Sequence, residues 1–249
     1  MTELANLTPT LAAVGLLMVL TAGVLKAFKV PHGFAPALAI LRGAAQLAAV
    51  SLILGAVIAS GTWVAVALGV MFVVAAMTAT RRLGWSWTHL AMVGSSMAAG
   101  IIVALAIVFA TGSIGFTGRY ALAIGGIVIG NSMTIAALAG RRFNEAVIDK
   151  WDLVEAWLAL GATPRQATRD MARGAASSAL IPSIDQTKTT GLVTLPGAFV
   201  GAIFGGLSPL EAGRFQIVVL ASIMAAGSIT AVMLVHMLAP VRVRPGALR

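Results

Sequence analysis

Polar side chains crowd the stretch 183–194, in a region of the chain that is otherwise apolar. Asp185 and Lys188 lie three residues apart, a spacing at which the two charges could simply pair on one face of a helix. Hydroxyl groups accompany them at Thr187, Thr189, Thr190 and Thr194. A carboxylate, an ammonium group and hydroxyls could also bind a charged solute, so this stretch is the richest candidate for a binding path.

The same stretch is expected to begin a helix that does not stay regular. Ser183 and Gln186 have the spacing of a capping box and predict a helix start. Pro196 and Gly197 should bend or break that helix. A helix broken at membrane depth often lines a pathway, because its freed backbone groups need partners. We therefore expect this helix to be the moving gate of a transport path.

Four other polar positions fall inside predicted helices. Arg42 and Gln46 are four residues apart and share one helix face. They line a path in one interpretation; in the other, Arg42 extends toward the nearer membrane surface. Asn131 either faces the same path or forms a hydrogen bond between helices. Gln216 is a weaker candidate of the same kind.

The residue types fit a bare metal ion poorly. An Fe²⁺ site would use carboxylate, histidine or thiolate ligands. The chain has no cysteine, Asp185 is the one carboxylate expected near a membrane core, and His32, His89 and His236 lie at the ends of predicted helices. Arg42 and Lys188 favour an anion, such as a chelated metal or a phosphate ester. Metal ligands within the chain therefore stay undefined.

The elements that hold these residues are membrane-spanning helices. Of 249 residues, 59% are hydrophobic and 10% charged, whereas about a quarter are charged in a soluble domain. Apolar runs of the roughly 20 residues that cross a bilayer recur along the chain. The predicted fold class is all-α, a polytopic membrane protein with one transmembrane domain over 1–249. The expected spans are 7–25, 36–59, 62–80, 88–110, 120–140, 184–207 and 210–238.

The basic residues orient these seven spans. The net charge of +9 could suggest nucleic acid binding, but the basic residues flank apolar spans instead of forming one soluble face. Cytoplasmic loops are enriched in Lys and Arg, which predicts an amino terminus outside and a carboxyl terminus in the cytoplasm. Only Arg119 and Arg214 fall on the outer side. The cytoplasmic set is Lys26, Lys29, Arg81, Arg82, Arg141, Arg142, Lys150, Arg165, Arg169, Arg173, Arg242, Arg244 and Arg249.

A polar insert between the fifth and sixth spans, residues 144–174, is predicted to form two helices. Asn144 can cap the first, and Gly161 can end it. An apolar stripe at helical spacing follows its inner face, made of Val147, Trp151, Val154 and Leu158. Thr163 then caps a second helix, with Pro164 at its first position and Gln166 completing a capping box. The expected result is an amphipathic hairpin against the cytoplasmic membrane surface.

Two interpretations of this hairpin remain open. The arginines at 165, 169 and 173 line one face and could contact anionic lipid headgroups. Alternatively, an acidic helix with aromatic side chains and a glycine turn could sit in the groove of a cytoplasmic partner protein.

Several motifs resemble one family of permeases. Glu155-Ala-Trp157, with Gly161 four residues beyond, is similar to the Glu-Ala-Ala loop of ABC-transporter permeases, with Trp157 in place of the second alanine. Longer stretches resemble the FetB-type permeases, the membrane half of a bacterial iron exporter, related to plant aluminium-tolerance half-transporters. They are 158–167 (LALGATPRQA), 181–185 (IPSID), 188–193 (KTTGLV), 195–197 (LPG) and 130–133 (GNSM).

The resemblance implies a permease of the bacterial cell membrane that exports iron and works with a separate ATPase subunit. ATP and Mg²⁺ would then bind the ATPase, and two copies of this chain would pair. The hairpin would contact the ATPase through Trp151, Glu155, Trp157, Gly161, Thr163, Pro164 and Arg165. This chain has no Gly-x-x-x-x-Gly-Lys-Ser/Thr phosphate loop and shows no sign of catalysis.

The expected transport path contains Arg42, Gln46, Asn131, Asp185, Thr187, Lys188, Thr190, Thr194, Pro196 and Gly197. Rival functions are the export of an anionic organic solute, such as a nucleotide sugar, and an ATP-independent carrier or membrane scaffold whose hairpin only binds lipid.

Overall fold

The computed structural model describes residues 2–31 and 33–246, with the side chains of 2–7 left out of the description. His32 and Arg249 therefore lie outside the described residues. The chain divides into two compact units, Met1–Ala59 and Ser60–Arg249. The first is a pair of packed helices, α1 (Thr2–Ala27) and α2 (Ala35–Ile58). Pro36 stands in the first turn of α2, where its missing N–H costs no helical hydrogen bond.

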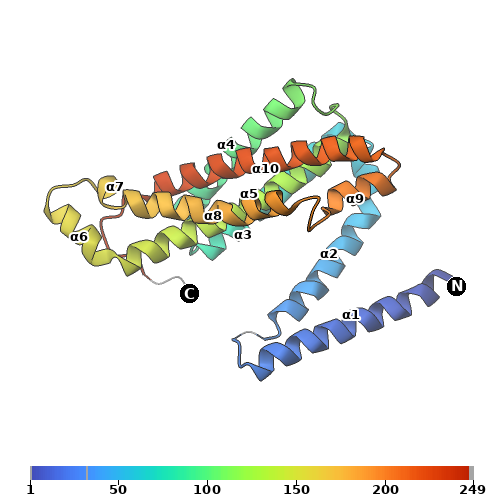
Figure 1. The fold of residues 1–249 in the computed structure, drawn as a ribbon, viewed down its shortest axis with the longest axis horizontal. Coiled ribbons are helices and arrows are strands. Elements are labelled where there is room, and N and C mark those ends of the chain that lie inside the picture. Colours follow the sequence, from blue (N-terminus) through green and yellow to red (C-terminus); the bar gives the residue numbers. More distant parts are fainter. Residues whose placement is uncertain (1, 32, 247–249) are drawn as a thin grey trace. The chain divides into compact units, whose positions relative to one another are not determined.

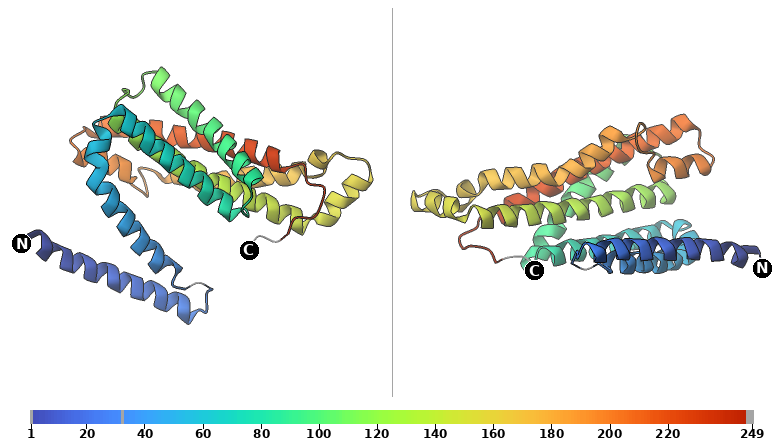
Figure 2. Two further views of the ribbon diagram at one scale, coloured as in Figure 1. Left: turned by 180° about the vertical axis from the view of Figure 1, so that it is seen from behind. Right: turned by 60° about the horizontal axis from the view of Figure 1, so that its bottom comes forward.

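The second unit is a helical bundle around two long helices (Figure 1). Its helices are α3 (Gly61–Arg82), α4 (Trp87–Ala110), α5 (Gly118–Asp149), α6 (Trp151–Ala159), α7 (Pro164–Ala167), α8 (Arg169–Thr189), α9 (Gly197–Phe204) and α10 (Pro209–Leu238). α10 packs against α4, α5, α8 and α9, and α5 packs against α3, α4 and α8. Both views in Figure 2 show α8 running beside α5 and α10.

The expected all-α membrane fold is confirmed. Among the described residues, six helices are long and apolar enough to cross a membrane: Thr8–Ala27 within α1, and α2, α3, α4, α5 and α10. Each coincides with a predicted span. α10 begins with a capping box, in which Ser208 and Glu211 exchange hydrogen bonds around Pro209.

The remaining predicted span, 184–207, is not one helix. The polar helix α8 ends at Thr189, a turn follows, and α9 begins at Gly197 with Pro196 as its N-cap. The break predicted at Pro196 and Gly197 is therefore present, as the junction between the turn and α9. The capping box predicted at Ser183 and Gln186 is wrong, because both residues lie inside α8.

The bundle core is built on close approach between small residues. A Cβ at Gly100 of α4 would collide with the Ala226 carbonyl oxygen of α10 and lie 2.8 Å from Thr230 Oγ1. A Cβ at Gly140 of α5 would collide with the Leu83 side chain. In a membrane, where burial of apolar surface drives helix association little, such tight packing supplies much of the attraction.

A second apolar cluster extends the bundle beyond its basic end. Its buried side chains come from α5, α6, α7, α8 and α10, and include Phe143, Val147, Val154, Ala167 and Met171. Trp151 and Leu158 pack against it. The predicted apolar stripe of the insert is therefore confirmed, and it holds α6 to the ends of the long helices.

The predicted start of the insert at Asn144 is wrong. α5 continues without interruption from Gly118 to Asp149, so Asn144 lies inside a helix and caps nothing. From Arg141 to Asp149 the helix rises about 12 Å at 1.5 Å per residue. α5 and α8 therefore carry the α6–α7 hairpin beyond the last apolar turns of the bundle. α8 itself continues through Pro182 to Thr189.

The contact at Gly100 gives a stability prediction. We expect Gly100→Val to lower the free energy of unfolding by about 1–3 kcal/mol, because the added carbons must push α4 away from α10. Thermal unfolding of the purified protein in detergent measures the change. Gly94→Val is the matched control on the same helix, since a Cβ at Gly94 meets nothing within 4 Å. Equal unfolding temperatures for the two variants would contradict this packing.

Candidate functional site

The α6–α7 hairpin turns sharply at Gly161. The backbone of Gly161 has φ +89°, a left-handed conformation that glycine adopts without a Cβ clash. Its N–H donates to the Leu158 carbonyl at 3.0 Å, and the Ala162 N–H donates to the Trp157 carbonyl at 3.0 Å. This pair of hydrogen bonds is a Schellman motif, which ends a helix by satisfying its last carbonyls. The predicted glycine stop is confirmed.

The predicted capping box after the turn is also confirmed. Thr163 Oγ1 accepts a hydrogen bond from the Gln166 N–H at 3.3 Å, and Gln166 Oε1 accepts one from the Thr163 N–H at 2.8 Å. Pro164 occupies the first helical position. The helix stop at Gly161 and the helix start at Thr163 thus fix the shape of the hairpin tip through local hydrogen bonds.

A groove of about 530 Å³ lies between α6 and the segment of α7 and α8 that follows the turn. Its apolar wall includes Leu153, Trp157 and Leu160, whose side chains are 51%, 50% and 81% exposed. Arg169 and Asp170 line its other side. Large apolar side chains exposed in a groove on a charged protrusion are typical of a protein-docking surface. Glu155 and Arg165 are exposed nearby, outside the groove lining.

The hairpin is tied to α10 by one buried hydroxyl. Thr168, fully buried between α7 and α8, donates from Oγ1 to the Ala239 carbonyl oxygen at 2.7 Å, with the Pro164 carbonyl 3.0 Å away. Ala239 caps the carboxyl end of α10. A displacement of the hairpin therefore reaches α10 through a short polar contact as well as through apolar packing.

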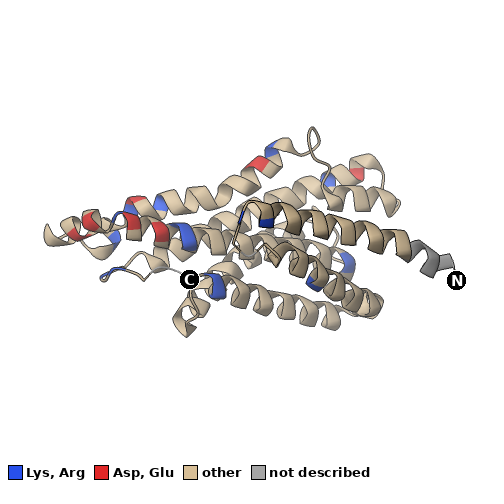
Figure 3. Ribbon diagram, turned by 90° about the horizontal axis from the view of Figure 1, so that it is seen from below, with Lys and Arg blue, Asp and Glu red and all other residues tan. Residues whose placement is uncertain are grey.

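Charged side chains gather at the hairpin end of the second unit (Figure 3). The chain positions at this end include Arg81, Arg82, Arg141, Arg142, Lys150, Arg165, Arg169, Arg173, Arg242 and Arg244. Exposed ion pairs join Glu145 to Arg141 at 3.9 Å and to Arg142 at 3.2 Å. The long helices thus separate a strongly basic end from a nearly uncharged opposite end.

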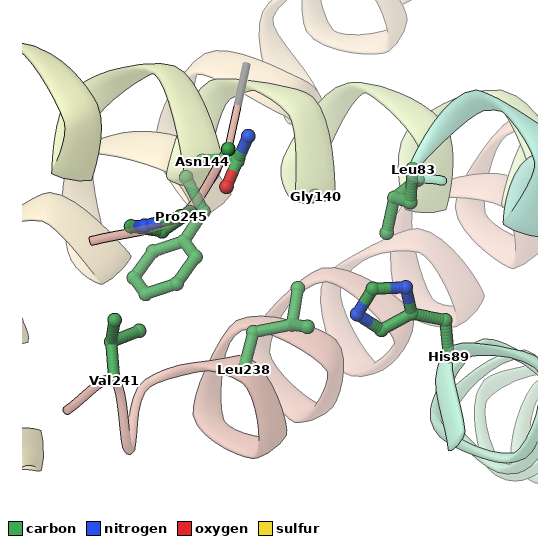
Figure 4. Close-up of a pocket in the computed structure, with 9 residues that line it drawn as sticks. Leu83, His89, Gly140, Asn144, Leu238, Val241 and Pro245 are labelled. Atoms are coloured by element: carbon green, nitrogen blue, oxygen red, sulfur yellow. The ribbon is translucent and has the colours of Figure 1, made fainter. Parts of the chain in front are cut away.

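A small cavity of about 250 Å³ lies at the same end, under the segment that follows α10 (Figure 4). His89 and Asn144 supply its polar groups, and its walls are mainly apolar. His89 Nδ1 lies 2.8 Å from the Gly84 carbonyl oxygen, while the buried Asn144 Nδ2 has no hydrogen-bond partner. One imidazole and one amide are too few for a metal centre.

The predicted path residues of α8 and the turn after it lie close together in the chain and in space. Asp185, Thr187 and Lys188 are exposed in the last turns of α8. Thr187 Oγ1 donates to the Ser183 carbonyl at 2.8 Å, and Thr190 Oγ1 donates to the Gln186 carbonyl at 2.7 Å. The hydroxyls thus bond to their own helix.

The turn between α8 and α9 satisfies its own backbone groups. The N–H groups of Val193 and Thr194 both donate to the Thr189 carbonyl, at 2.9 and 3.2 Å. The Gly191 N–H, at a residue with φ +86°, donates to the Thr194 carbonyl at 2.8 Å. Pro196 is then the N-cap of α9, and Gly197 is the first residue of that helix. The turn thus pairs several of its own N–H groups, which lowers the cost of an irregular segment next to membrane-spanning helices.

The other predicted path residues are not brought to that site. Asn131 lies on α5, where its Nδ2 donates to the Ile127 carbonyl of the same helix at 2.9 Å. Arg42 and Gln46 share a face of α2, in the amino-terminal unit. Their participation in one path with Asp185 and Lys188 stays a prediction. Among the described residues, no three His, Cys, Asp or Glu side chains cluster as metal ligands would.

Some candidate residues were missed by sequence reasoning. Leu153 and Leu160 were not predicted, although with the predicted Trp157 they repeat at intervals of four and three residues, a second apolar stripe that could have indicated the groove. Thr168 carries no such signal, because its partner Ala239 is 71 residues away along the chain.

Three relatives show what the chain is similar to. It is 39% identical over 183 residues to the UPF0014 membrane protein STAR2 of Oryza sativa subsp. japonica, which covers 73% of this chain and 64% of that protein. It is 35% identical over 133 residues to the Probable iron export permease protein FetB of Escherichia coli (strain K12), 53% of this chain and 51% of that one. With the UPF0014 membrane protein YjkA of Bacillus subtilis (strain 168), identity is 33% over 203 residues, 79% of this chain and 80% of YjkA.

The chain thus spans about half to two thirds of the length of STAR2 and FetB. No solved structure matches it. The family described as Uncharacterised protein family (UPF0014) matches residues 8–241, nearly the whole chain. This multi-pass membrane protein therefore belongs to the UPF0014 family.

Proposed function

We propose that this chain is the permease subunit of an ABC transporter that exports iron or a metal-linked solute, driven by a separate ATPase subunit. Two copies of the chain would pair in the cell membrane, with the amino terminus outside and the carboxyl terminus in the cytoplasm. The likeness to FetB supports the permease and its cargo class. The observation that carries the ATPase partnership is the apolar groove on a charged protrusion.

The hairpin has the properties that a docking element for a motor protein needs. Its shape is fixed by the Gly161 turn and the Thr163 capping box, so little ordering entropy is lost on binding. Its exposed face offers Trp157, an aromatic side chain of the type that dominates binding energies at interfaces. Its inner face is packed against α5 and α8, so force on the tip can pass to the membrane helices.

Truncating the groove should release the ATPase. We expect Trp157→Ala to weaken binding of the ATPase subunit about thirtyfold, the order of effect of a central aromatic residue. Affinity capture of the tagged chain from membranes, followed by photolabelling of the captured subunit with an ATP analogue, measures this.

Trp63→Ala is the matched control for that experiment. Trp63 is 59% exposed and lies in the first turn of α3, at the opposite end of the unit from the hairpin. Unchanged capture by both tryptophan variants would remove the hairpin from the docking role.

The Thr168 contact predicts a separation of binding from coupling. Thr168→Val keeps the side-chain shape but removes the donor to the Ala239 carbonyl, at a cost of about 1–3 kcal/mol for the unpaired buried oxygen. We expect ATPase capture to stay unchanged, because Thr168 is buried away from the groove. Cargo-stimulated ATP hydrolysis in nanodiscs should fall; full stimulation would show that this contact carries no coupling.

Arg42 tests the cargo path. ATP hydrolysis by the complex in nanodiscs, measured across iron salts, iron chelates and a nucleotide sugar, identifies the best cargo class. We expect Arg42→Ala to lower stimulation by that cargo about tenfold or more, if the guanidinium contacts a negatively charged group. A result equal to wild type would place the path elsewhere, and stimulation by a nucleotide sugar alone would replace the metal cargo with an anionic solute.

A further inference from the structure

One face of α8 is polar and uncovered within the Ser60–Arg249 unit. Gly174, Ser178, Ile181, Asp185 and Lys188 recur at three- and four-residue intervals and are all exposed. The opposite face, which includes Ala175, Ala179 and Ser183, is buried against α5 and α10. A helix with a buried apolar face normally turns its polar face to water, but this one runs alongside membrane-spanning helices.

Helix geometry places Asp185 near the middle of the bilayer, with Arg141 taken as the cytoplasmic edge of the hydrocarbon core. Leu180 of α8 and Ile135 of α5 both flank Gly227 of α10, so they have the same depth. Ile135 is six residues from Arg141 at the basic end of α5, and Asp185 is five residues beyond Leu180 in the same outward direction. At 1.5 Å per residue, Asp185 lies about 16 Å from the level of Arg141, half of a hydrocarbon core of about 30 Å.

Lipid cannot cover this face. A carboxylate and an ammonium group in hydrocarbon are costly unless they are paired or in water. Pro182, on the same side of the helix, has no N–H to give to the Ser178 carbonyl, which leaves that oxygen in need of a partner. Asp185 and Lys188 do not pair with each other, since the ion pairs within the described residues are Arg141–Glu145, Arg142–Glu145 and Arg173–Asp170.

The charges on this face are complementary to those on a copy of itself. In two copies related by a twofold axis along the membrane normal, residues of α8 at the same depth face each other. Each contact between the copies then occurs twice. Asp185 and Lys188 differ in depth by about 4.5 Å, one helical turn that a flexible lysine stem can span. Gly174 and Ser178, small residues four apart, allow the two backbones to approach closely.

We propose that the α8 faces of two copies meet at mid-membrane, where Asp185 of each copy pairs with Lys188 of the other and closes the transport path. The closing of a transport path rests on the proposed function. The contact between copies rests only on the charges and depth of α8. Opening the path requires separating both ion pairs, and α8 is the helix that leads directly from the α6–α7 hairpin to them. The same residues then become available to a charged cargo.

Disulfide cross-linking in membranes tests the contact. The chain contains no cysteine, so a single introduced cysteine reports on one position. We expect Ser178→Cys to form a disulfide-linked dimer on mild oxidation, because cross-linking needs Cβ atoms about 4 Å apart. Ile102→Cys is the matched control: Ile102 is 65% exposed on α4 and should stay monomeric. A Ser178→Cys chain that stays monomeric overturns the proposal.

Charge exchange tests the pairing. In the Ser178→Cys background, Asp185→Lys or Lys188→Asp places like charges opposite each other, and the linked fraction should fall about tenfold. The double variant, Asp185→Lys with Lys188→Asp, restores opposite charges and should recover the wild-type fraction. Failure of the double variant to recover, while the protein still folds by its unfolding temperature, overturns the reciprocal pairs.

An uncharged substitution tests the same contact between copies, so the test does not depend on the folding of the charge variants. A Cβ at Gly174 meets nothing within 4 Å inside the chain, so Gly174→Leu leaves the fold intact and obstructs only a neighbouring copy. We expect the Ser178→Cys dimer to fall about tenfold in that background. An unchanged dimer overturns close contact at this face.

Two further outcomes separate this inference from the proposed function. If Ser178→Cys links instead to a cysteine placed on α2 of the same chain, the amino-terminal unit covers the face and the proposal fails. If the dimer forms but no ATPase is captured, the contact between copies stands and the proposed function fails.

Discussion

The hydrocarbon interior of a membrane solvates charge poorly and offers no hydrogen-bond partners, and the structure follows from that constraint. Because of this constraint, the spanning segments are helices, whose backbone groups form hydrogen bonds within the helix. For the same reason, basic residues gather at the end of the bundle that carries the hairpin. The constraint also explains the turn after α8, where the Thr189 carbonyl accepts from the turn's own N–H groups. Asp185 and Lys188 are the exception that the proposed contact between copies addresses, because both are exposed charges on α8, a helix packed against the long helices α5 and α10.

A second consequence of this constraint concerns α5 and α8, the two helices that extend beyond the apolar part of the bundle. α5 and α8 continue past the apolar bundle, pack against each other, and present α6 and α7 at their ends. The apolar cluster around Phe143 and Val154 holds this extension together, and Thr168 joins it to the end of α10. One helix, α8, leads from the groove at the hairpin to the exposed charges of Asp185 and Lys188. In the function proposed above, this continuity would let an ATPase subunit outside the membrane act on those charges.

Sequence patterns predicted the parts of this fold that depend on neighbours in the chain. The Gly161 turn, the Thr163 cap and six of the seven predicted spans are local, and each appears where its pattern placed it. Asn144 and Ser183 resembled helix caps, but both lie inside helices because packing of Phe143, Val147 and Ala179 outweighs the local signal. The groove and the Thr168–Ala239 hydrogen bond needed tertiary structure, since they join segments far apart in sequence. The relation of Arg42 to α8 depends on how the two units meet, which no local pattern encodes.

The central claim is that the α6–α7 hairpin stands in the cytoplasm. Because the chain has no cysteine, Ala156→Cys on the exposed face of α6 places one thiol on the hairpin. A membrane-impermeant thiol reagent can then be applied to right-side-out and to inside-out vesicles. The account predicts labelling in inside-out vesicles and none in right-side-out vesicles until they are permeabilised. Labelling of intact right-side-out vesicles would place the hairpin outside the cell and contradict the account.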